Sequence, residues 1–327
     1  MFLIGVLATS ILLLLIYNFY WKRRPFPPGP TPLPLVGNVL TIARHPPGYA
    51  AFQQWQAQYG PVFTYWISEI PVVAVTDYAT IKETFIRNGD AYAGRDFLND
   101  GFACLTEFIP GVHGVVRTEG EEWRVLRRFS AQVLKDLGMG KVEMEDVILD
   151  EVQTLFELVD KEIDGLSGGG NVDTMARVEA AVGSVITRLI FGYQLKKEAH
   201  SMFGRLKKIM NEEVEMSDGV LTKLSLVMPS LRHLPFFSSA FAAYDRNITQ
   251  HFEFYDKQIQ RIQAERANKN SEMKPTSYVE AFLAEIDKDE GHYFTLQALR
   301  GSCFELYGAG QVERASLVFI YSLPLRL

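Results

Sequence analysis

The most informative stretch of the sequence reads TEGEEWRVLRRFSAQVL and spans residues 118–134. Thr118 and Glu121 have the spacing of a capping box, which predicts a helix that begins here. Trp123 and Arg127 lie four residues apart, so a helix places both side chains on one face. An indole N–H and a guanidinium fork on one face can bind a single anionic group.

An alternative interpretation of the same stretch is a solvent-exposed helix. Its arginines, which include Arg124 and Arg128, would then form ion pairs with Glu119, Glu121 and Glu122. Spacing alone favours this alternative, because ion pairs between neighbouring turns are common on helix surfaces.

A short hairpin and then a series of helices are predicted around this stretch. PVFTYWI (residues 61–67) and PVVAV (71–75) are β-branched and aromatic runs separated by three residues, which is typical of a β-hairpin. Asp77 is a candidate N-cap of a helix that ends near Gly89. From residue 144 onward, apolar residues at spacings of three and four predict one face of a long amphipathic helix: Met144, Ile148, Val152, Leu155, Phe156, Val159 and Ile163.

Five more helices are expected downstream, over Met175–Phe191, Lys196–Met216, Ala240–Ala267, Tyr278–Ile286 and Thr295–Gly308. The predicted fold is therefore mainly α with a small β-sheet.

Composition excludes several classes of protein. The chain has 327 residues, of which 47% are hydrophobic, and this is enough for a sizeable core. Its formal net charge of -6 argues against a general affinity for nucleic acid. The two cysteines, Cys104 and Cys303, belong to no C-x-x-C motif or Cys/His cluster, so we expect no metal site built on protein ligands and no disulfide framework.

The N-terminus predicts a membrane anchor. Phe2 to Trp21 contains no charged residue, and its length of twenty residues matches a bilayer's hydrocarbon core. Lys22, Arg23 and Arg24 follow at once and favour a cytoplasmic body. The alternative, a cleaved signal peptide, fits less well because the apolar core is long and no A-x-A site follows. Residues 1–21 are thus the predicted anchor, and 22–34 a basic stop and a proline-rich hinge that forms a stiff spacer.

An ordered series of motifs extends these predictions. After the anchor come PPGPTPLPLVGN, YGPVFTYWI, PVVAVTDY, YAGRD, WRVLRRF, VGSVITRLIFGYQL, LRHLPFF and ELYGAGQ. In this order, from residue 2 to about 311, the chain resembles the cytochrome P-450 family, the haem-thiolate monooxygenases, in its membrane-bound microsomal animal form.

The resemblance implies haem as the cofactor and assigns roles to several residues. Trp123 and Arg127 would hold a haem propionate, and Arg95 of YAGRD would hold the propionates from the other side. Ala309 and Gly310 would lie over the haem face. The apolar substrate pocket would include Val115, Val116 and Phe304, although each of these also suits ordinary core packing.

The sequence departs from the family pattern after Gln311. The family continues with an acidic residue and a threonine that deliver protons to bound dioxygen, whereas Val312 and Glu313 stand here. Neither Cys104 nor Cys303 lies in the family's glycine-rich loop that carries the axial thiolate. The resemblance therefore covers an incomplete P-450 fold over residues 35–311, followed by an apolar tail, 312–327, which we interpret as unrelated to it.

The functional expectation has two forms. The family implies insertion of one oxygen atom of O2 into a small apolar substrate, with electrons from an NADPH-dependent reductase, in a single-pass protein of the endoplasmic reticulum membrane. As written, the chain is expected to be inactive, because it lacks the axial cysteine and the acid–threonine pair. The alternative is a non-catalytic remnant or binding protein anchored in the same membrane.

Overall fold

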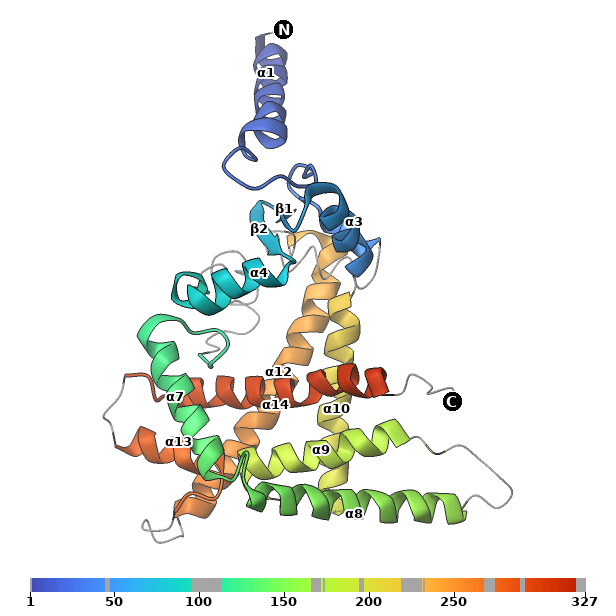
Figure 1. The fold of residues 1–327 in the computed structure, drawn as a ribbon, viewed down its shortest axis with the longest axis vertical. Coiled ribbons are helices and arrows are strands. Elements are labelled where there is room, and N and C mark those ends of the chain that lie inside the picture. Colours follow the sequence, from blue (N-terminus) through green and yellow to red (C-terminus); the bar gives the residue numbers. More distant parts are fainter. Residues whose placement is uncertain are drawn as a thin grey trace. The chain divides into compact units, whose positions relative to one another are not determined.

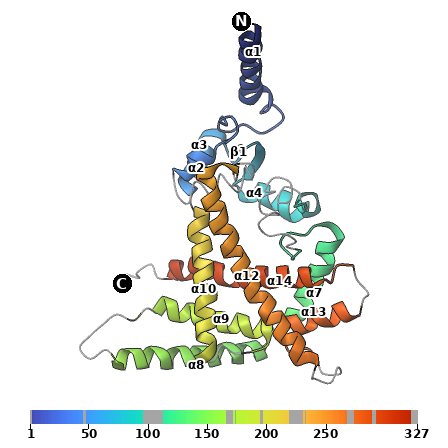
Figure 2. The same ribbon diagram turned by 180° about the vertical axis from the view of Figure 1, so that it is seen from behind.

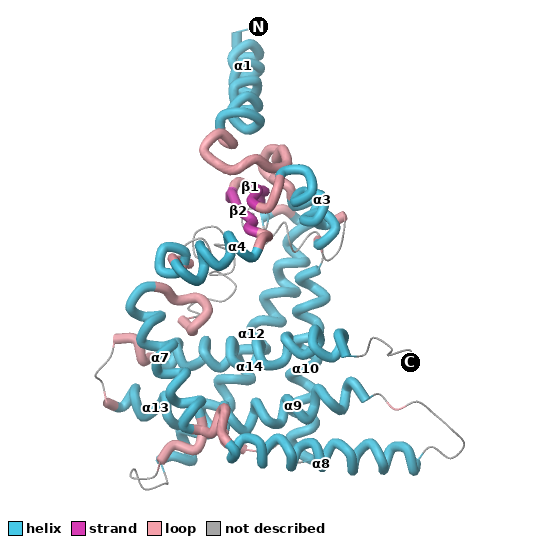
Figure 3. The backbone as a smooth tube through the Cα atoms, in the orientation of Figure 1, coloured by secondary structure: helices cyan, strands magenta, loops and turns pink. Residues whose placement is uncertain are grey.

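The computed structural model describes residues 2–44, 48–95, 113–165, 172, 174–193, 197–218, 231, 233–267, 274–288 and 292–321. Helices dominate these residues, and a single antiparallel pair of strands accompanies them (Figure 3). The prediction of a mainly α fold with a small sheet is confirmed. The chain divides into two compact units, Met1–Phe108 with Val214–Asp245 and Ile109–Glu213 with Arg246–Leu327.

The first unit begins with the predicted anchor helix. Helix α1 (Phe2–Ile16) continues into a π-helical turn, η1 (Tyr17–Trp21), as Figure 1 shows. Together they form one helix of 20 residues with a mean hydropathy of 2.3. Within the described part of the chain this is the one helix long and apolar enough to cross a membrane.

Part of the proline-rich segment packs on the hairpin. Gly29 lies so close to β1 that a Cβ atom added to it would stand 1.8 Å from the carbonyl oxygen of Thr64. The backbone N–H of Thr64 donates to the Pro28 carbonyl at 3.1 Å. Lys22 forms an ion pair with Glu69, which ties the basic residues to the hairpin. The contact is possible because a residue without a side chain lets the two backbones touch. The role of the segment as a stiff spacer between membrane and body stays a prediction.

The hairpin forms as predicted. Strand β1 (Val62–Ile67) pairs antiparallel with β2 (Ile70–Val75), with Val62 opposite Val75. Helix α3 (Tyr49–Tyr59) covers it and buries Ala51 and Trp55 against Phe63. The short helix α2 (Val39–Ala43) precedes α3.

Asp77 caps the helical segment that follows the hairpin. Its carboxylate accepts the backbone N–H of Thr80 at 2.9 Å, as the sequence predicts. The segment consists of α4 (Tyr78–Ile81), the π-helical η2 (Lys82–Arg87) and the 3-10 turn η3 (Gly89–Tyr92).

The second unit contains the stretch TEGEEWRVLRRFSAQVL. Helix α7 (Gly120–Asp136) starts one residue later than the capping box requires, with Glu119 at the N-cap position and no side-chain cap. The Thr118 hydroxyl instead donates to the Gly114 carbonyl at 2.6 Å. The capping-box prediction is therefore wrong, because the preceding turn uses the hydroxyl that would have capped the helix.

Helix α8 (Val142–Gly165) packs beside α9 (Thr174–Phe191) in both views (Figures 1 and 2). The amphipathic helix is confirmed, but much of its predicted apolar face is not buried. Met144 is buried, whereas Ile148, Phe156 and Ile163 are 44%, 58% and 52% exposed.

The remaining helices match the predicted ones with shifted ends. They are α10 (Lys197–Asp218), α12 (Pro235–Ala267), α13 (Tyr278–Asp287) and α14 (Leu296–Tyr321). Helix α12 starts five residues earlier than expected, at a proline that suits the first turn of a helix. Helix α14 does not end at Gly308 but continues through Tyr321, so it carries the GAG segment in its interior.

Candidate functional site

Arg124 and Arg127, on the exposed side of α7, have different partners. Arg124 pairs with Glu121, with a distance of 3.5 Å between Nη1 and Oε2. Arg127, by contrast, lies over the ring of Trp123, with its guanidinium carbon 5.6 Å from the ring centroid. Arg127 is exposed and has no ion pair among the described residues. The surface-helix interpretation therefore holds for Arg124, whereas Arg127 retains a guanidinium fork that can bind an anion.

The other acid in the first turn of α7 is also engaged. Glu122 faces His113, with 3.3 Å between Oε1 and Nδ1. The sequence could not show this partner, because the ring comes from the preceding turn rather than from the helix.

Arg95 belongs to the first unit. Its side chain is partly buried, and Nη1 donates to the carbonyl oxygen of Ala93 at 2.7 Å. Trp123 and Arg127 belong to the second unit. The shared propionate role of the three residues therefore stays a prediction.

Glu305 of α14 is a functional candidate that the sequence motifs did not indicate. Its Oε2 accepts the backbone N–H of Val116 at 2.9 Å. A Cβ atom on Gly114 would stand 2.0 Å from the same oxygen, so only glycine leaves room for the carboxylate. This side chain thus fastens the turn at residues 114–117 to α14. The one signal in the sequence is a single carboxylate within the apolar run GSCFELYGAG.

Burial raises the pKa of Glu305 to about 7, although the N–H group of Val116 and the charge of Arg117 act in the opposite direction. Its Oε1 is buried and has no hydrogen-bond partner in the described part of the chain. A carboxyl group in this position keeps its proton more readily than one in water.

The three candidate pocket residues lie in different surroundings. Val115 is partly buried and Val116 is 55% exposed, both on the turn that Glu305 fastens. Phe304 packs against α12, with its ring centroid 5.0 Å from that of His251 and 5.3 Å from that of Phe252. These are the contacts of a packing residue, so the pocket role of Phe304 stays a prediction.

Ala309 and Gly310 face different surroundings within α14. Ala309 is exposed, whereas a Cβ atom on Gly310 would stand 2.3 Å from Cδ1 of Ile186. Gly310 therefore lets α14 approach α9 closely. The side chains of Val312 and Glu313 lie outside those that the structure describes. The haem-face assignment stays a prediction.

Cys303 does not have the properties of a haem ligand. It is fully buried on α14, and burial, with Asp256 nearby, raises the pKa of its thiol. Binding of haem iron requires a thiolate. Cys104 falls outside the described residues.

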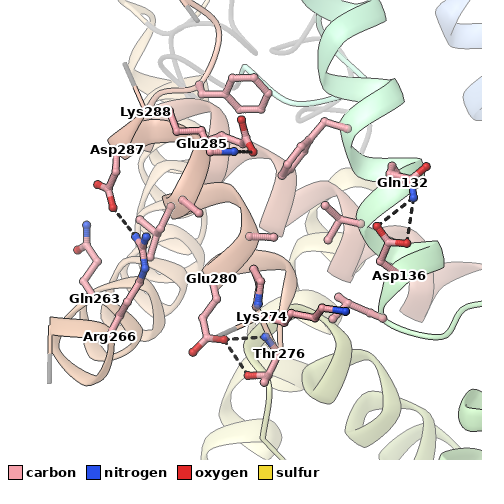
Figure 4. A pocket seen from close by; sticks show the side chains of 18 of the residues that line it. Gln132, Asp136, Gln263, Arg266, Lys274, Thr276, Glu280, Glu285, Asp287 and Lys288 are labelled. Carbon is pink, nitrogen blue, oxygen red and sulfur yellow. Dashed lines mark hydrogen bonds and ion pairs between the residues drawn. The ribbon is translucent and has the colours of Figure 1, made fainter. Parts of the chain in front are cut away.

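A separate cleft of about 1520 Å³ lies between α7, the end of α12 and α13 (Figure 4). Arg266 and Asp287 form an ion pair at 2.6 Å on its wall, and Glu280 accepts from both the N–H and the hydroxyl of Thr276. The lining includes neither Trp123 nor Arg127. The cleft is thus distinct from the predicted propionate site.

Comparison with known proteins identifies the family. The sequence profile of the cytochrome P-450 family matches residues 27–318. The chain belongs to the cytochrome P-450 family. The resemblance that the ordered motifs predicted is therefore confirmed, and haem is the cofactor that membership implies.

Individual relatives agree with this assignment. The chain is 30% identical over 326 residues to cytochrome P-450 2G1 of Oryctolagus cuniculus, with 98% of this chain and 62% of the relative covered. It is 29% identical over 327 residues to cytochrome P-450 2C25 of Mesocricetus auratus, with the same coverage of both chains. The chain thus spans about 62% of the length of these two curated relatives.

The hydrogen-bond donors of Trp123 and Arg127 on α7 suit a haem propionate. Arg127 presents a cation with no acidic partner among the described residues, beside an indole that has an N–H donor. A propionate carboxylate is a suitable acceptor for both. The described residues thus fit the periphery of haem, whereas the buried thiol of Cys303 does not fit its iron.

Proposed function

We propose that this protein is a membrane-anchored haem monooxygenase that acts on a small apolar substrate. Haem that is bound through a thiolate, a ligand that Cys303 does not supply, favours cleavage of the O–O bond of dioxygen. The residues of this chain would bind and orient the cofactor: Trp123 and Arg127 at one propionate, and Arg95 at the propionates from the other side. The turn at residues 114–117, fastened by Glu305, would border the substrate.

One observation carries the proposal. Arg127 is exposed and rests on Trp123 without an acidic partner among the described residues, whereas Arg124, three positions earlier on the same helix, is paired with Glu121. A guanidinium held against an indole is preorganised to bind a carboxylate with two hydrogen bonds.

The test is haem binding by purified full-length protein in detergent. The variant Arg127→Ala should weaken haem binding by about tenfold, the effect of losing one charge-assisted hydrogen bond. Arg127→Lys should restore part of the affinity, since it keeps the charge but not the fork. The matched control Arg124→Ala should leave the affinity unchanged.

Equal losses in the Arg127→Ala and Arg124→Ala variants would contradict the assignment. An absence of haem binding by the unmodified chain would favour the alternative, a non-catalytic membrane-anchored binding protein. The absorption spectrum of the reduced carbon monoxide complex would reveal whether a thiolate holds the iron.

The proposed cellular setting rests on the N-terminal helix. We infer a single-pass protein of the endoplasmic reticulum membrane whose body faces the cytoplasm. An NADPH-dependent reductase in the same membrane would supply the electrons. The apolar helix and the basic residues at its end support this arrangement.

A further inference from the structure

Three hydrogen-bonding side chains form a row between α10 and α12, and two of them are buried. Glu213 of α10 faces His251 of α12, with 3.1 Å between Oε2 and Nδ1. The other ring nitrogen, Nε2, lies 3.3 Å from the hydroxyl of Tyr255, one turn further along α12. The side chain of His251 is 2% exposed and Tyr255 is fully buried. Helices α10 and α12 run side by side in both views (Figures 1 and 2).

With Glu213 ionised and His251 neutral, the chemistry of the three groups gives both hydrogen bonds one direction. An ionised carboxylate only accepts, so Nδ1 of His251 carries the proton and donates it to Glu213. In a neutral imidazole, Nε2 is then an acceptor, and Tyr255 donates its phenolic proton to it. The phenolic O–H of Tyr255 thus faces a basic nitrogen of His251. The other ring nitrogen of His251 is hydrogen-bonded to the negatively charged carboxylate of Glu213.

The phenol of Tyr255 does not lose its proton by simple ionisation. Burial raises the pKa of Tyr255 well above its ordinary value, and the neighbouring Tyr307, Cys303 and Glu213 raise it further. The phenol therefore keeps its proton in ordinary solution conditions. A phenol that has lost one electron is a strong acid, however, and it transfers its proton readily to a base already within hydrogen-bonding distance.

The surroundings exclude water from the phenol. The ring of Tyr255 contacts Phe304 and Tyr307 of α14, with centroids 6.2 Å apart in each pair, and stacks on Phe191 of α9 at 6.4 Å. A radical formed there would be separated from solvent reactants by packed side chains. Glu213, with 23% of its side chain exposed, is the end of the row nearest to water.

We propose that Tyr255 is a redox-active tyrosine whose oxidation is coupled to proton transfer through His251 and Glu213. One electron passes from the phenol to an outer-sphere oxidant such as a ruthenium(III) polypyridyl complex, which is reduced to ruthenium(II). The O–H bond breaks, and the proton moves to Nε2 of His251. The resulting imidazolium stays hydrogen-bonded to the Glu213 carboxylate through Nδ1. A one-electron reductant reverses the step, and the proton returns to the phenolate oxygen.

Two other tyrosines provide the comparison. Tyr278 is also fully buried, but its hydroxyl is paired with the Ser130 hydroxyl at 2.8 Å, and a hydroxyl is a poor base. Tyr193, which is partly buried, donates to the amide oxygen of Gln258 at 2.7 Å. Of these three tyrosines, Tyr255 is the one whose hydroxyl faces an imidazole.

The experiment uses the full chain in detergent and an external oxidant, so its outcome does not depend on haem binding. A flash-generated ruthenium(III) polypyridyl complex oxidises the protein, and electron paramagnetic resonance follows the tyrosyl signal after exposed radicals have decayed. We expect a long-lived signal that narrows when the tyrosines carry ring deuterium. Tyr255→Phe should abolish this signal, and the matched control Tyr278→Phe should retain it.

Two further variants separate a redox role from a purely structural one. Glu213→Gln keeps the shape of the acceptor but removes its charge, and should shorten the lifetime of the radical by about tenfold, as expected for one charge-assisted hydrogen bond. His251→Phe keeps the stacked ring and removes the base, and should eliminate the long-lived signal in a folded protein. Circular dichroism verifies the fold of each variant. A signal that persists in Tyr255→Phe, or no long-lived signal in the unmodified chain, would overturn the proposal.

Discussion

Among single residues, Glu305 holds a turn in place through a hydrogen bond, but its burial disfavours the charged form of its carboxyl group. Its carboxylate fastens the turn at Val116, yet burial raises its pKa to about 7, from an ordinary value of 4.5. Between these two values the folded state binds a proton that the unfolded state has released. The free energy of unfolding therefore falls as the pH rises from about 4.5 to about 7, by an amount on the order of 3 kcal/mol.

The variant Glu305→Gln tests this dependence. A glutamine cannot ionise, so the variant should lack this part of the decrease in stability, and its advantage over the unmodified chain should grow from pH 5 to pH 8. Thermal unfolding followed by circular dichroism at both pH values measures the difference. A parallel decrease in the two proteins would show that Glu305 does not titrate in this range.

The propionate residues show how far single positions can be predicted. The four-residue spacing of Trp123 and Arg127 correctly placed both on one face of α7, because helical periodicity is local. Which arginine keeps its guanidinium available could not be predicted in the same way. That depends on Glu121 pairing with Arg124 and on His113, from another turn, pairing with Glu122.

At the element scale, the contact between the proline-rich segment and β1 depends on one missing side chain. In the variant Gly29→Ala, the new methyl group would meet the carbonyl oxygen of Thr64, a backbone atom that cannot rotate away. We expect a loss of about 2 kcal/mol in the free energy of unfolding, typical of an overpacked site.

Urea denaturation measures the effect of Gly29→Ala. The control is Gly89→Ala in the same unit, where nothing lies within 4 Å of the added atom. Its stability should stay within about 1 kcal/mol of the unmodified chain. A harmless Gly29→Ala would mean that this segment is free of β1 in solution.

Elements were easier to predict than their ends and contacts. The hairpin and the later helices follow from periodicity. The hydrogen bond of Thr118 and the backbone contact of Gly29 depend instead on atoms that only the folded chain brings together. The apolar face of α8 is a further example. The spacing of its residues identifies Phe156 as part of that face but cannot specify what packs against it, and Phe156 is exposed. Glu305 escaped prediction because its partner, Val116, is 189 residues away in the chain.

For the molecule as a whole, the proposed membrane anchoring rests on the N-terminal helix. The uninterrupted apolar sequence should retain the chain in microsomal membranes after alkaline extraction. Introducing two charges with Leu13→Arg and Leu14→Arg should release it, because each arginine near the centre of a spanning helix costs about 2.5 to 3.5 kcal/mol. The control pair Thr9→Ala and Ser10→Ala changes polarity slightly and should stay bound.

Protease added outside sealed microsomes then reports the orientation of the body. We expect degradation of everything beyond the basic residues 22–24, and protection would place the body in the lumen instead. Glycosylation at the N-x-T sequon Asn247-Ile248-Thr249 is no substitute for this assay. Asn247 is 4% exposed and its amide donates to the Ile209 carbonyl at 2.9 Å, so the folded chain hides that acceptor on either side of the membrane.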